Sequence, residues 1–409
     1  MKKANIKEIT TDVKWIGALD PDLRTFDIVM ETKSGTSYNS YFINADKKCI
    51  VETVKLKFWE SYLSNLQTLC QPDEIEYIIV NHTEPDHSGS LCKLLELAPK
   101  AKVVGSGNCI RYLKEIMNID FKNIIVKDGD SLDLGNKTLQ FINAPNLHWP
   151  DSIYTYLVED KLLFSCDSFG AHYCDENLFD DLSGNFDEEF KYYFDVILKP
   201  YSRFMLKAIE KIKTLDIYCI CPGHGAVLRK NWKKYVELSA QYSQQALTLP
   251  VRGRVFIAYV SAYDYTGRIA RKIAEGVSSV NKASCELLDI EKTPVERLAA
   301  EIEQSEAYII GSPTINQNTL LQIYQLFAFI NPIRDHGKLA AAFGSFGWSG
   351  EAARIIEGCL LNLKLDIFQE KLSIRFNPSE EELKAAFDFG KHFAEKLLNL
   401  NNSYKNVTH

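Results

Sequence analysis

Short apolar runs separated by turn residues fill the chain up to about residue 250, a pattern that predicts strands. Turn pairs such as Asp128-Gly129 and Glu159-Asp160 separate the runs. The clearest runs are Lys102–Gly105, Ile124–Lys127, Thr138–Asn143, Ile153–Val158 and Leu162–Cys166. Apolar residues at helical spacing then predict a helix over Trp232–Ala246. The first part of the chain is therefore predicted to be rich in strands.

The pattern changes after the segment Leu249-Pro250-Val251-Arg252-Gly253, which is the best candidate for a linker. Beyond it, strand-like runs each precede a helical segment. The runs are Arg254–Val260, Cys285–Ile290, Ala307–Ile310, Leu339–Phe343 and Lys371–Phe376. Five such units predict a doubly wound parallel five-stranded sheet, and about 155 residues suit one flavodoxin-like domain. We therefore expect two domains, 1–250 and 251–409.

Composition excludes several classes of protein. The chain has 409 residues, 46% of them hydrophobic, and 47 basic against 54 acidic residues give a net charge of −7. This balance argues against a nucleic-acid binder, which needs a basic surface. The sequence has no run of about 18 apolar residues and no signal-peptide core, so we expect a cytoplasmic protein without a membrane segment.

The number and spacing of the cysteines indicate their redox state and argue against some metal sites. There are 10 of them and no Cys-x-x-Cys pair, so we expect reduced, mostly buried thiols. The missing pair also argues against a rubredoxin module or a zinc ribbon on this chain.

Side chains that bind metals cluster directly after the predicted buried strand Glu74–Val80. The segment that follows, Asn81–Ser90, holds four of them within six residues: His82, Glu84, Asp86 and His87. Imidazole and carboxylate together suit first-row transition metals. Pro85 and Gly89 in the same segment favour a turn that would aim these side chains.

Three more candidate ligands follow predicted strands elsewhere: His148, Asp167 and His224. A single histidine beside a strand is more often an ordinary buried polar residue than a ligand. Loops at one edge of a sheet converge in space, however, so the seven residues together predict one metal centre.

Three loops of the second half are candidates for a flavin site, because ligands of doubly wound sheets bind at the carboxyl ends of the strands. The residues are Ser261, Tyr263, Asp264, Tyr265 and Thr266, then Ser312, Pro313, Thr314, Ile315 and Asn316, then Ser345, Phe346, Gly347, Trp348, Ser349 and Gly350. Hydroxyls and amides at a helix N-terminus suit a phosphate, and aromatic rings suit an isoalloxazine. FMN is the ligand that fits best, since no Gly-x-Gly-x-x-Gly follows a strand.

Ordinary explanations remain for parts of this flavin pattern. The first loop taken alone also fits a solvated turn, and an inward-facing Asp264 would repel a phosphate. Phe346 and Trp348 also fit simple packing positions.

The motif His82-x-x-x-Asp86-His87, followed by widely spaced His, Asp and His, resembles that of metallo-β-lactamases. Most members of that superfamily have a second histidine where this chain has Glu84, a change that makes the site richer in oxygen ligands and suits iron. With a flavodoxin-like domain downstream, the chain resembles the flavo-diiron (A-type flavoprotein) family over essentially its whole length. The resemblance includes Gly35–Tyr41 and implies an N-terminal αββα sandwich.

The resemblance also implies roles for single residues. One iron would be bound by His82, Glu84 and His148, the other by Asp86, His87 and His224, with Asp167 as the bridge. Tyr193 and His172 are the candidate catalytic residues beside the metals; Tyr192 and Tyr193 face different directions on a helix, so at most one of them reaches the site. Many relatives have a histidine where this chain has Asp27.

The family's activity is the reduction of dioxygen to water, of nitric oxide to nitrous oxide, or of both. The resemblance therefore implies two iron ions, FMN, and rubredoxin or another small electron donor on a separate chain. It also implies a head-to-tail homodimer, or a dimer of such dimers. Two alternatives remain: a zinc hydrolase fused to a flavodoxin-like module, and an electron-transfer flavoprotein whose metal domain is structural.

Overall fold

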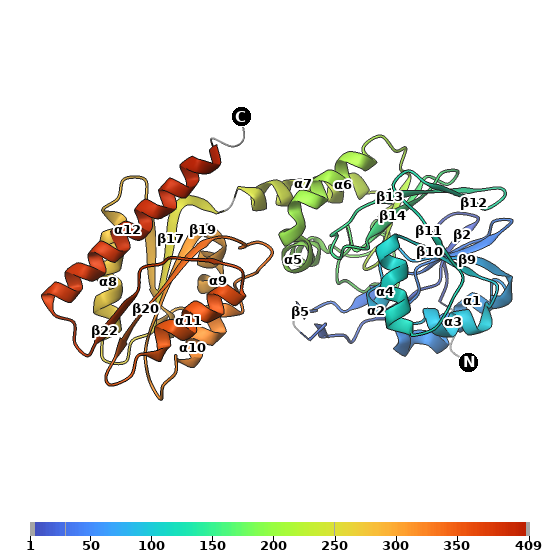
Figure 1. The fold of residues 1–409 in the computed structure, drawn as a ribbon. Helices are drawn as coiled ribbons and strands as arrows, with labels where there is room; N and C mark the ends of the chain where they lie inside the picture. The colour runs from blue at the N-terminus through green and yellow to red at the C-terminus, as the bar shows by residue number, and fades with distance from the viewer. Residues whose placement is uncertain (1–4, 29, 249, 406–409) are drawn as a thin grey trace. The chain divides into compact units, whose positions relative to one another are not determined.

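The computed structural model describes residues 5–28, 30–248 and 250–405, and the chain divides into two compact units, Met1–Leu247 and Thr248–His409 (Figure 1). Leu249 of the predicted linker lies outside the described residues. Among the helices of these ranges, none combines the length and apolar character that a membrane crossing requires.

The first unit contains two facing sheets. The larger has the strand order β1-β2-β7-β8-β9-β10-β11. Its strands are β1 (Lys7–Glu8), β2 (Val13–Trp15), β7 (Tyr41–Ile43), β8 (Lys48–Val51), β9 (Ile75–Ile79), β10 (Lys102–Gly105) and β11 (Asn123–Ile125). The smaller follows chain order: β12 (Ser131–Asp133), β13 (Thr138–Asn143), β14 (Ile153–Leu157), β15 (Leu162–Cys166) and β16 (Cys219–Pro222).

The inner faces of the two sheets share one apolar core. Trp15 and Ile79 of the larger sheet and Phe141 and Phe164 of the smaller belong to the same buried cluster. Side chains that alternate along each strand therefore fill the space between the sheets. Two short hairpins pair β3 (Ala18–Asp20) with β6 (Thr36–Tyr38), and β4 (Thr25–Phe26) with β5 (Met30–Glu31).

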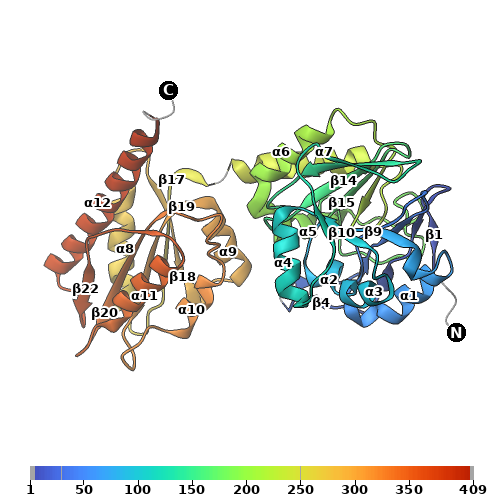
Figure 2. The same cartoon turned by 45° about the vertical axis from the view of Figure 1, so that its right-hand side comes forward.

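Helices cover the outer face of each sheet (Figure 2). Buried residues of α1, α3 and α4 pack on the larger sheet, and those of α5, α6 and α7 pack on the smaller. The helices are α1 (Trp59–Gln67), α2 (Pro85–Ser88), α3 (Leu91–Leu97), α4 (Gly107–Met117), α5 (Asp187–Tyr193), α6 (Ser202–Ile212) and α7 (Trp232–Leu247). The shorter turns are η1 (Leu56–Phe58), η2 (Pro72–Glu74), η3 (Phe194–Leu198) and η4 (Lys199–Tyr201). This arrangement confirms the predicted αββα sandwich.

The second unit is a parallel sheet of order β18-β17-β19-β20-β21, with β22 also paired to β20. The strands are β17 (Val251–Tyr259), β18 (Ser284–Asp289), β19 (Ser305–Pro313), β20 (Leu339–Phe346), β21 (Asp366–Ile367) and β22 (Leu372–Arg375). The helices are α8 (Tyr265–Ser278), α9 (Val295–Gln304), α10 (Leu321–Phe327), α11 (Glu351–Asn362) and α12 (Glu380–Lys405), with the turn η5 (Ile290–Lys292).

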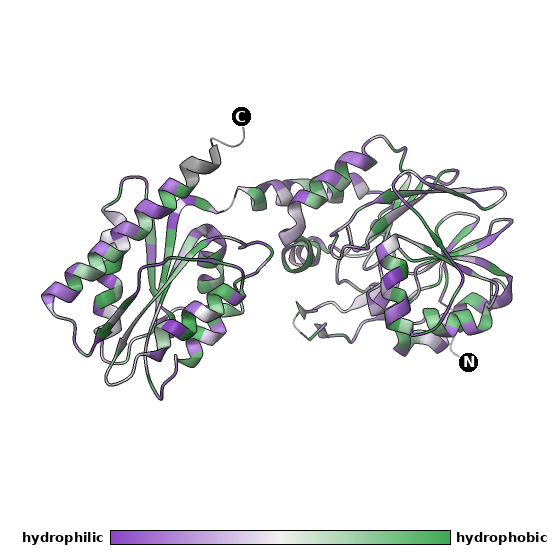
Figure 3. Cartoon of the chain, in the orientation of Figure 1, coloured by the Kyte–Doolittle hydropathy of each residue, from purple (hydrophilic) through white to green (hydrophobic). Residues whose placement is uncertain are grey.

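Separate apolar clusters lie on the two faces of this sheet. One joins the sheet to α8 and α12, and the other joins it to α9, α10 and α11. Figure 3 shows the matching pattern, with largely hydrophobic strands and helices that alternate hydrophobic and hydrophilic faces. The doubly wound parallel sheet is thus confirmed.

Three details of the second unit differ from the sequence predictions. The fifth strand position is shared by β21 and β22, which both pair with β20. Strands β19 and β20 run on to Pro313 and Phe346, so part of each predicted loop is strand.

The third difference is that β17 begins at Val251, inside the predicted linker. The register of its pairing with β19 shifts between Val251 and Val255, and Gly253 lies there with φ +73°. A Cβ on Gly253 would lie 2.2 Å from the carbonyl oxygen of Lys282. Glycine therefore lets the strand bulge and continue instead of ending it.

Candidate metal centre

Seven buried or half-buried side chains meet where several strands of the first unit end. His82 and Glu84 follow β9, Asp86 and His87 lie on α2, and His148 lies in the loop between β13 and β14. Asp167 directly follows β15, and His224 follows β16. All seven predicted ligands are thus brought together in one place.

The first group of side chains is His82, Glu84, His148 and Asp167. Oε2 of Glu84 lies 3.2 Å from Nε2 of His82 and 2.8 Å from Nε2 of His148. Oδ2 of Asp167 lies 3.6 Å from the same two nitrogens. Four donor atoms therefore surround one point, as a metal ion requires.

The second group is Asp86, His87 and His224, again with Asp167 beside it. Oδ2 of Asp86 lies 3.0 Å from Nε2 of His224 and 3.6 Å from Nε2 of His87. Oδ1 of Asp167 lies 3.1 Å from Nε2 of His87 and 3.6 Å from Nε2 of His224. Asp167 thus presents one oxygen to each group, which is the geometry of a carboxylate shared by two metal ions.

The far nitrogens of two of these imidazoles are held by other groups. Nδ1 of His82 lies 3.2 Å from Oδ1 of Asp151, whose other oxygen accepts hydrogen bonds from the backbone N–H and hydroxyl of Thr83, both 2.8 Å. Nδ1 of His224 lies 2.7 Å from the carbonyl oxygen of Ser37. These contacts fix the ring orientation and leave Nε2 free for a metal.

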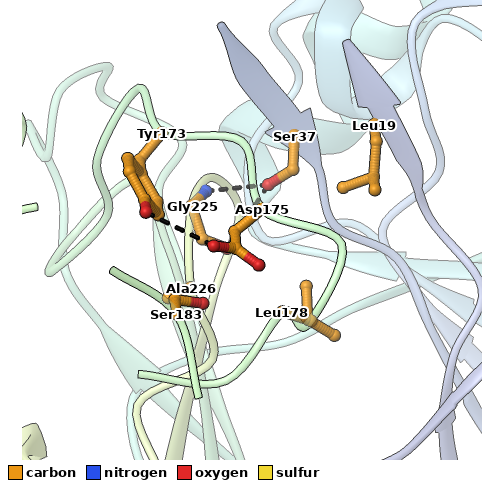
Figure 4. Close-up of a pocket in the computed structure, with 8 residues that line it drawn as sticks. All are labelled: Leu19, Ser37, Tyr173, Asp175, Leu178, Ser183, Gly225 and Ala226. Carbon is orange, nitrogen blue, oxygen red and sulfur yellow. Dashed lines mark hydrogen bonds between the residues drawn. The ribbon is translucent and has the colours of Figure 1, made fainter. Parts of the chain in front are cut away.

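The loop that carries His224 is held in place by a hydrogen bond from the next residue, Gly225, to Ser37 (Figure 4). The N–H of Gly225 donates to Oγ of Ser37 at 2.8 Å, drawn as a dashed line in that figure. Gly223 on the other side of His224 has no room for a side chain, because a Cβ there would lie 2.6 Å from Cε1 of His87. The Pro-Gly-His-Gly sequence therefore lets the His224 loop pass directly over a second ligand.

A buried carboxylate that the sequence analysis did not single out lies behind His87. Glu52 is 2% exposed and follows β8 with φ +61°. Its Oε1 accepts the backbone N–H of Asn81 at 2.8 Å, and burial raises its pKa to about 7. Glu52, His87 and Cys166 place their ligand-type atoms within 4.8 Å of one another. The signal for Glu52 was its position, an acidic residue at the end of a buried apolar strand.

The charges of the site suit cations. Burial favours protonation of Asp167, but the charge of His87 and a hydrogen bond from it outweigh burial and lower the pKa of the carboxyl well below its usual value. Both carboxylate oxygens of Asp86 and Oδ2 of Asp167 are buried, and no described group hydrogen-bonds to them. Among the described residues only the imidazoles of the two groups lie beside these oxygens, and buried carboxylates of this kind are costly unless a cation binds them, so the residues fit a pair of metal ions.

The three predicted flavin loops follow β17, β19 and β20, which are neighbours in the second sheet. Tyr263 is 82% exposed and Trp348 is 86% exposed. Oγ1 of Thr266 lies 2.8 Å from Oγ of Ser345, which joins the first loop to the third, and Oγ of Ser261 accepts the N–H of Gly267 at 3.2 Å. Large exposed aromatic rings in loops that follow neighbouring strands, together with the hydroxyls at the start of α8, fit a flavin and its phosphate.

The structure adds two details about these loops. Asp264 pairs with Arg271, Oδ2 to Nη2 at 2.6 Å, so its charge is already balanced. Ser312, Pro313 and Ser345 are buried strand residues, whereas the others of the predicted set lie in or beside the loops.

Comparison with known proteins decides the family. Residues 36–225 match the family model described as ODP family beta lactamase, and residues 257–390 match the flavodoxin model. The flavo-diiron protein FprA2 of Clostridium acetobutylicum is 40% identical over 402 residues, which span 95% of this chain and 99% of the relative. The chain belongs to the flavo-diiron family.

Other relatives agree with this assignment. The nitric oxide reductase of Moorella thermoacetica is 33% identical to this flavo-diiron chain, over 95% of the chain and 98% of the relative. The structure of rubredoxin oxygen:oxidoreductase from the anaerobe Desulfovibrio gigas matches with a TM-score of 0.70 and 27% identity, over 96% and 99% of the two chains. The protein is therefore an oxidoreductase, and its family implies FMN and a diiron centre, which both sets of residues fit.

Two further predicted residues of this flavo-diiron chain line the metal centre. The hydroxyl of Tyr193 donates to Oδ1 of Asp167 at 3.0 Å, whereas Tyr192 points outward and is 39% exposed. His172 is buried, with its ring centroid 4.8 Å from that of Tyr193 and 5.3 Å from that of His224. Burial and the charge of His224 lower the pKa of His172 to about 3, so its imidazole is neutral.

Asp27, which the sequence analysis singled out as a departure from the family pattern, lies beside the first group. Its carboxyl hydrogen-bonds to Glu84, and burial together with that contact raises its pKa to about 6. It lies in the turn between β4 and β5, where both Asp27 and Ile28 have positive φ. The position thus reaches the metal centre with a carboxyl group.

Proposed function

We propose that the protein reduces nitric oxide, dioxygen or both at its diiron centre, with electrons that pass through FMN from an external redox protein. One observation carries the proposal: Asp167 presents Oδ2 to one imidazole–carboxylate group and Oδ1 to the other. The names of the relatives support it, since one is a nitric oxide reductase and another a rubredoxin oxygen:oxidoreductase.

The ligands follow from the two groups. His82, Glu84 and His148 would bind one iron, and Asp86, His87 and His224 the other, with Asp167 shared. Two iron ions and FMN supply the electron transfer when bound. The chain's own residues orient and shield this centre: Asp151 and the Ser37 carbonyl hold the imidazoles, and the buried loops exclude bulk water.

Tyr193 and His172 are the side chains placed to act on a small molecule beside the metals. The Tyr193 hydroxyl touches the shared carboxylate, and the neutral His172 ring lies between Phe26, Tyr193 and His224. Both carry transferable protons, and both reductions consume protons. We therefore assign them the positioning and protonation of the reacting molecule.

The zinc hydrolase alternative is not favoured. Glu84 contacts His82 and His148 through a carboxylate, in a position where most zinc hydrolases of this fold use a further imidazole. The relatives found are flavo-diiron proteins rather than hydrolases.

The activity is tested by anaerobic purification, metal and flavin analysis, and stopped-flow reaction of the reduced protein with each gas. We expect about two iron and one FMN per chain, in line with two ligand groups and one flavin domain. Rapid oxidation by one gas and slow oxidation by the other would define the substrate. Zinc without flavin, or no oxidation by either gas, would refute the proposal.

We also propose a head-to-tail homodimer in which the flavin of one subunit serves the iron site of the other, in the cytoplasm and with rubredoxin or a similar small donor. Exposed apolar side chains support an interface near the metal centre: Ile28 is 93% exposed on the β4–β5 turn, and Val196 is 39% exposed just after α5. Such residues are typical of surfaces that another protein covers.

Mixed dimers test this arrangement. One dimer joins a subunit with H148A to a subunit with W348A and T266A; the other joins a wild-type subunit to one that carries all three changes. In a head-to-tail dimer only the first mixture keeps one intact flavin–iron pair, so it alone is active. Activity confined to the second mixture would mean transfer within one chain and would contradict the proposal.

A further inference from the structure

A cavity of about 240 Å³ opens beside the metal centre in the first unit. Its walls come from β5 and the loop after it, and from α5: Glu31, Lys33, Glu188, Glu189 and Tyr192, with His172 as a further wall residue. Water occupies roughly 30 Å³ per molecule, so the cavity has room for several waters. The side chains that line it are polar or charged, so water in the cavity can hydrogen-bond to its walls.

His172 connects this cavity to the metal centre. The residue is 2% exposed, and no described group hydrogen-bonds to its Nε2. Its other nitrogen, Nδ1, lies 3.0 Å from Oγ1 of Thr36, and its ring packs against those of Tyr193 and His224. His172 therefore belongs both to the wall of the cavity and to the cluster of rings at the metal centre, and so links the two.

The carboxylates of the cavity give it a negative charge. Three glutamates face one lysine there, and a cavity of this sign attracts protons. Glu189 is half-buried, and its Oε1 accepts a hydrogen bond of 2.6 Å from Oγ of Ser34, which fixes its position. The neighbouring wall is fixed as well, since the backbone N–H of Glu31 donates to the Tyr192 hydroxyl at 3.2 Å.

We propose that this cavity is the proton entry of the enzyme and that Glu189 is its proton-supplying residue. The proposal rests on the proposed function: dioxygen takes four electrons and four protons to give two waters, and two nitric oxides take two electrons and two protons to give nitrous oxide and water. Glu189 in its acid form gives a proton to the cavity water that leads to His172, and solvent then restores the proton to Glu189. No electron passes through the cavity, because FMN and iron supply that path.

The test uses the variant E189Q in the iron- and FMN-loaded protein, with E115Q as its matched control. Gln keeps the size of Glu189 and can still accept the Ser34 hydrogen bond, so the fold and metal content stay intact. Glu115 is an exposed glutamate of α4 in the same unit. Positioned proton donors contribute about 10²- to 10⁴-fold, and since Glu188 and water remain in the cavity we expect a loss of about tenfold in turnover.

Three readouts separate proton supply from a merely structural role. Proton uptake, followed with a pH-indicator dye, slows in E189Q in step with turnover, and the solvent deuterium isotope effect rises. Formate, a weak acid small enough for the cavity, restores turnover in E189Q and leaves wild type unchanged. E189D retains most of the activity, because it keeps the carboxyl.

The outcomes also distinguish failure of the proton-entry proposal from failure of the proposed function on which it rests. If wild-type protein consumes neither gas, the proposed function fails. If wild type is active but E189Q matches E115Q, or loses activity without rescue by formate, the proton entry is refuted. A slower first reaction with the gas in E189Q, with unchanged proton uptake, would make the cavity a gas path and would equally overturn the proposal.

Discussion

The hydroxyl of Tyr193 donates a hydrogen bond to Oδ1 of Asp167 at 3.0 Å, and the same oxygen lies 3.1 Å from Nε2 of His87. Both Tyr193 and Asp167 are buried. The shared carboxylate is thus held from the protein side by a phenol while it faces both groups of ligands. A hydrogen bond of this kind restricts the carboxylate to one orientation.

Replacing Tyr193 by Phe removes this hydrogen bond and little volume. A hydrogen bond to a charged group is worth about 1.5–3 kcal/mol, so we expect turnover to fall by roughly ten- to a hundredfold. Iron content stays near that of wild type, because all seven ligand side chains remain. Metal analysis beside steady-state gas consumption checks both parts. Y218F, which changes a tyrosine of the same unit that is 54% exposed, is the control and retains full activity.

Asp151 holds the His82 imidazole as Tyr193 holds Asp167. Its replacement, however, should lower the iron content of the protein. D151N weakens the contact to Nδ1 of His82 and leaves the Thr83 N–H and hydroxyl with a poorer acceptor. Loss of such a supporting carboxylate costs about 10- to 100-fold in metal affinity. We expect iron per chain to fall while FMN per chain is unchanged, as measured by metal analysis and flavin absorbance. D120N, at an exposed position, keeps both; equal iron in D151N and D120N would contradict the assignment.

The convergence of the seven candidate ligands could be predicted from the sequence because each lies in a loop or short helix that follows a strand with a clear apolar pattern. His82 follows β9 and Asp167 follows β15, and sheet topology alone brings such loops together. Which oxygen of Asp167 faces which group could not be predicted. That depends on the turn after β15, where Cys166 and Phe169 have positive φ without being glycine.

Supporting residues were harder to predict because their roles depend on contacts between distant segments. Glu52, which lies behind His87, is marked only by its position after a buried strand, and Glu189, which lines the cavity, carries no local motif. Ser345 was predicted in a loop, yet it lies in a strand because β20 keeps pairing with β22 as far as Phe346. Tertiary pairing decided that boundary, and no feature of the local sequence marks it.

Trp348 provides a test of the flavin site. It is 86% exposed on the loop after β20, a position that a bound isoalloxazine would cover. Aromatic stacking contributes about 0.5–1.5 kcal/mol beyond the buried area, so W348A should weaken FMN binding by roughly tenfold. Titration of the flavin-free protein with FMN, followed by the quenching of flavin fluorescence, measures the change. L361A alters an exposed apolar residue near the end of α11 and should bind FMN like wild type.

A buried ion cluster in the second unit predicts a pH-dependent stability. Asp335 is fully buried, and its Oδ2 lies 2.7 Å from Nη2 of Arg334 while its Oδ1 lies 2.9 Å from Nζ of Lys338. The backbone N–H of Asn331 donates to Oδ2 of Asp335 at 2.8 Å. Burial alone would raise the pKa of Asp335, but its hydrogen bond with Arg334 and the charge of Lys338 outweigh burial and lower that pKa below 3.8.

The sign of the pH effect follows from this lowered pKa. The folded state holds Asp335 ionised more firmly than the unfolded chain does, so the cluster stabilises the fold above pH 3.8. That stabilisation is lost as the pH falls through the folded-state pKa, when the carboxyl takes up a proton. D335N mimics the protonated form and leaves Arg334 and Lys338 without their carboxylate, which costs about 3 kcal/mol at neutral pH.

The measurement is urea unfolding of the full FMN-loaded chain at a series of pH values, with the rise of flavin fluorescence as the signal for the second unit. We expect D335N to unfold at lower urea than wild type at pH 7, and the gap to narrow below about pH 3.8 because wild type then loses the same interaction. D366N, at an exposed aspartate of β21, follows the wild-type curve throughout. A gap that widens as the pH falls would mean that Asp335 is protonated in the folded state at neutral pH, and the ion cluster would then not stabilise the flavin domain.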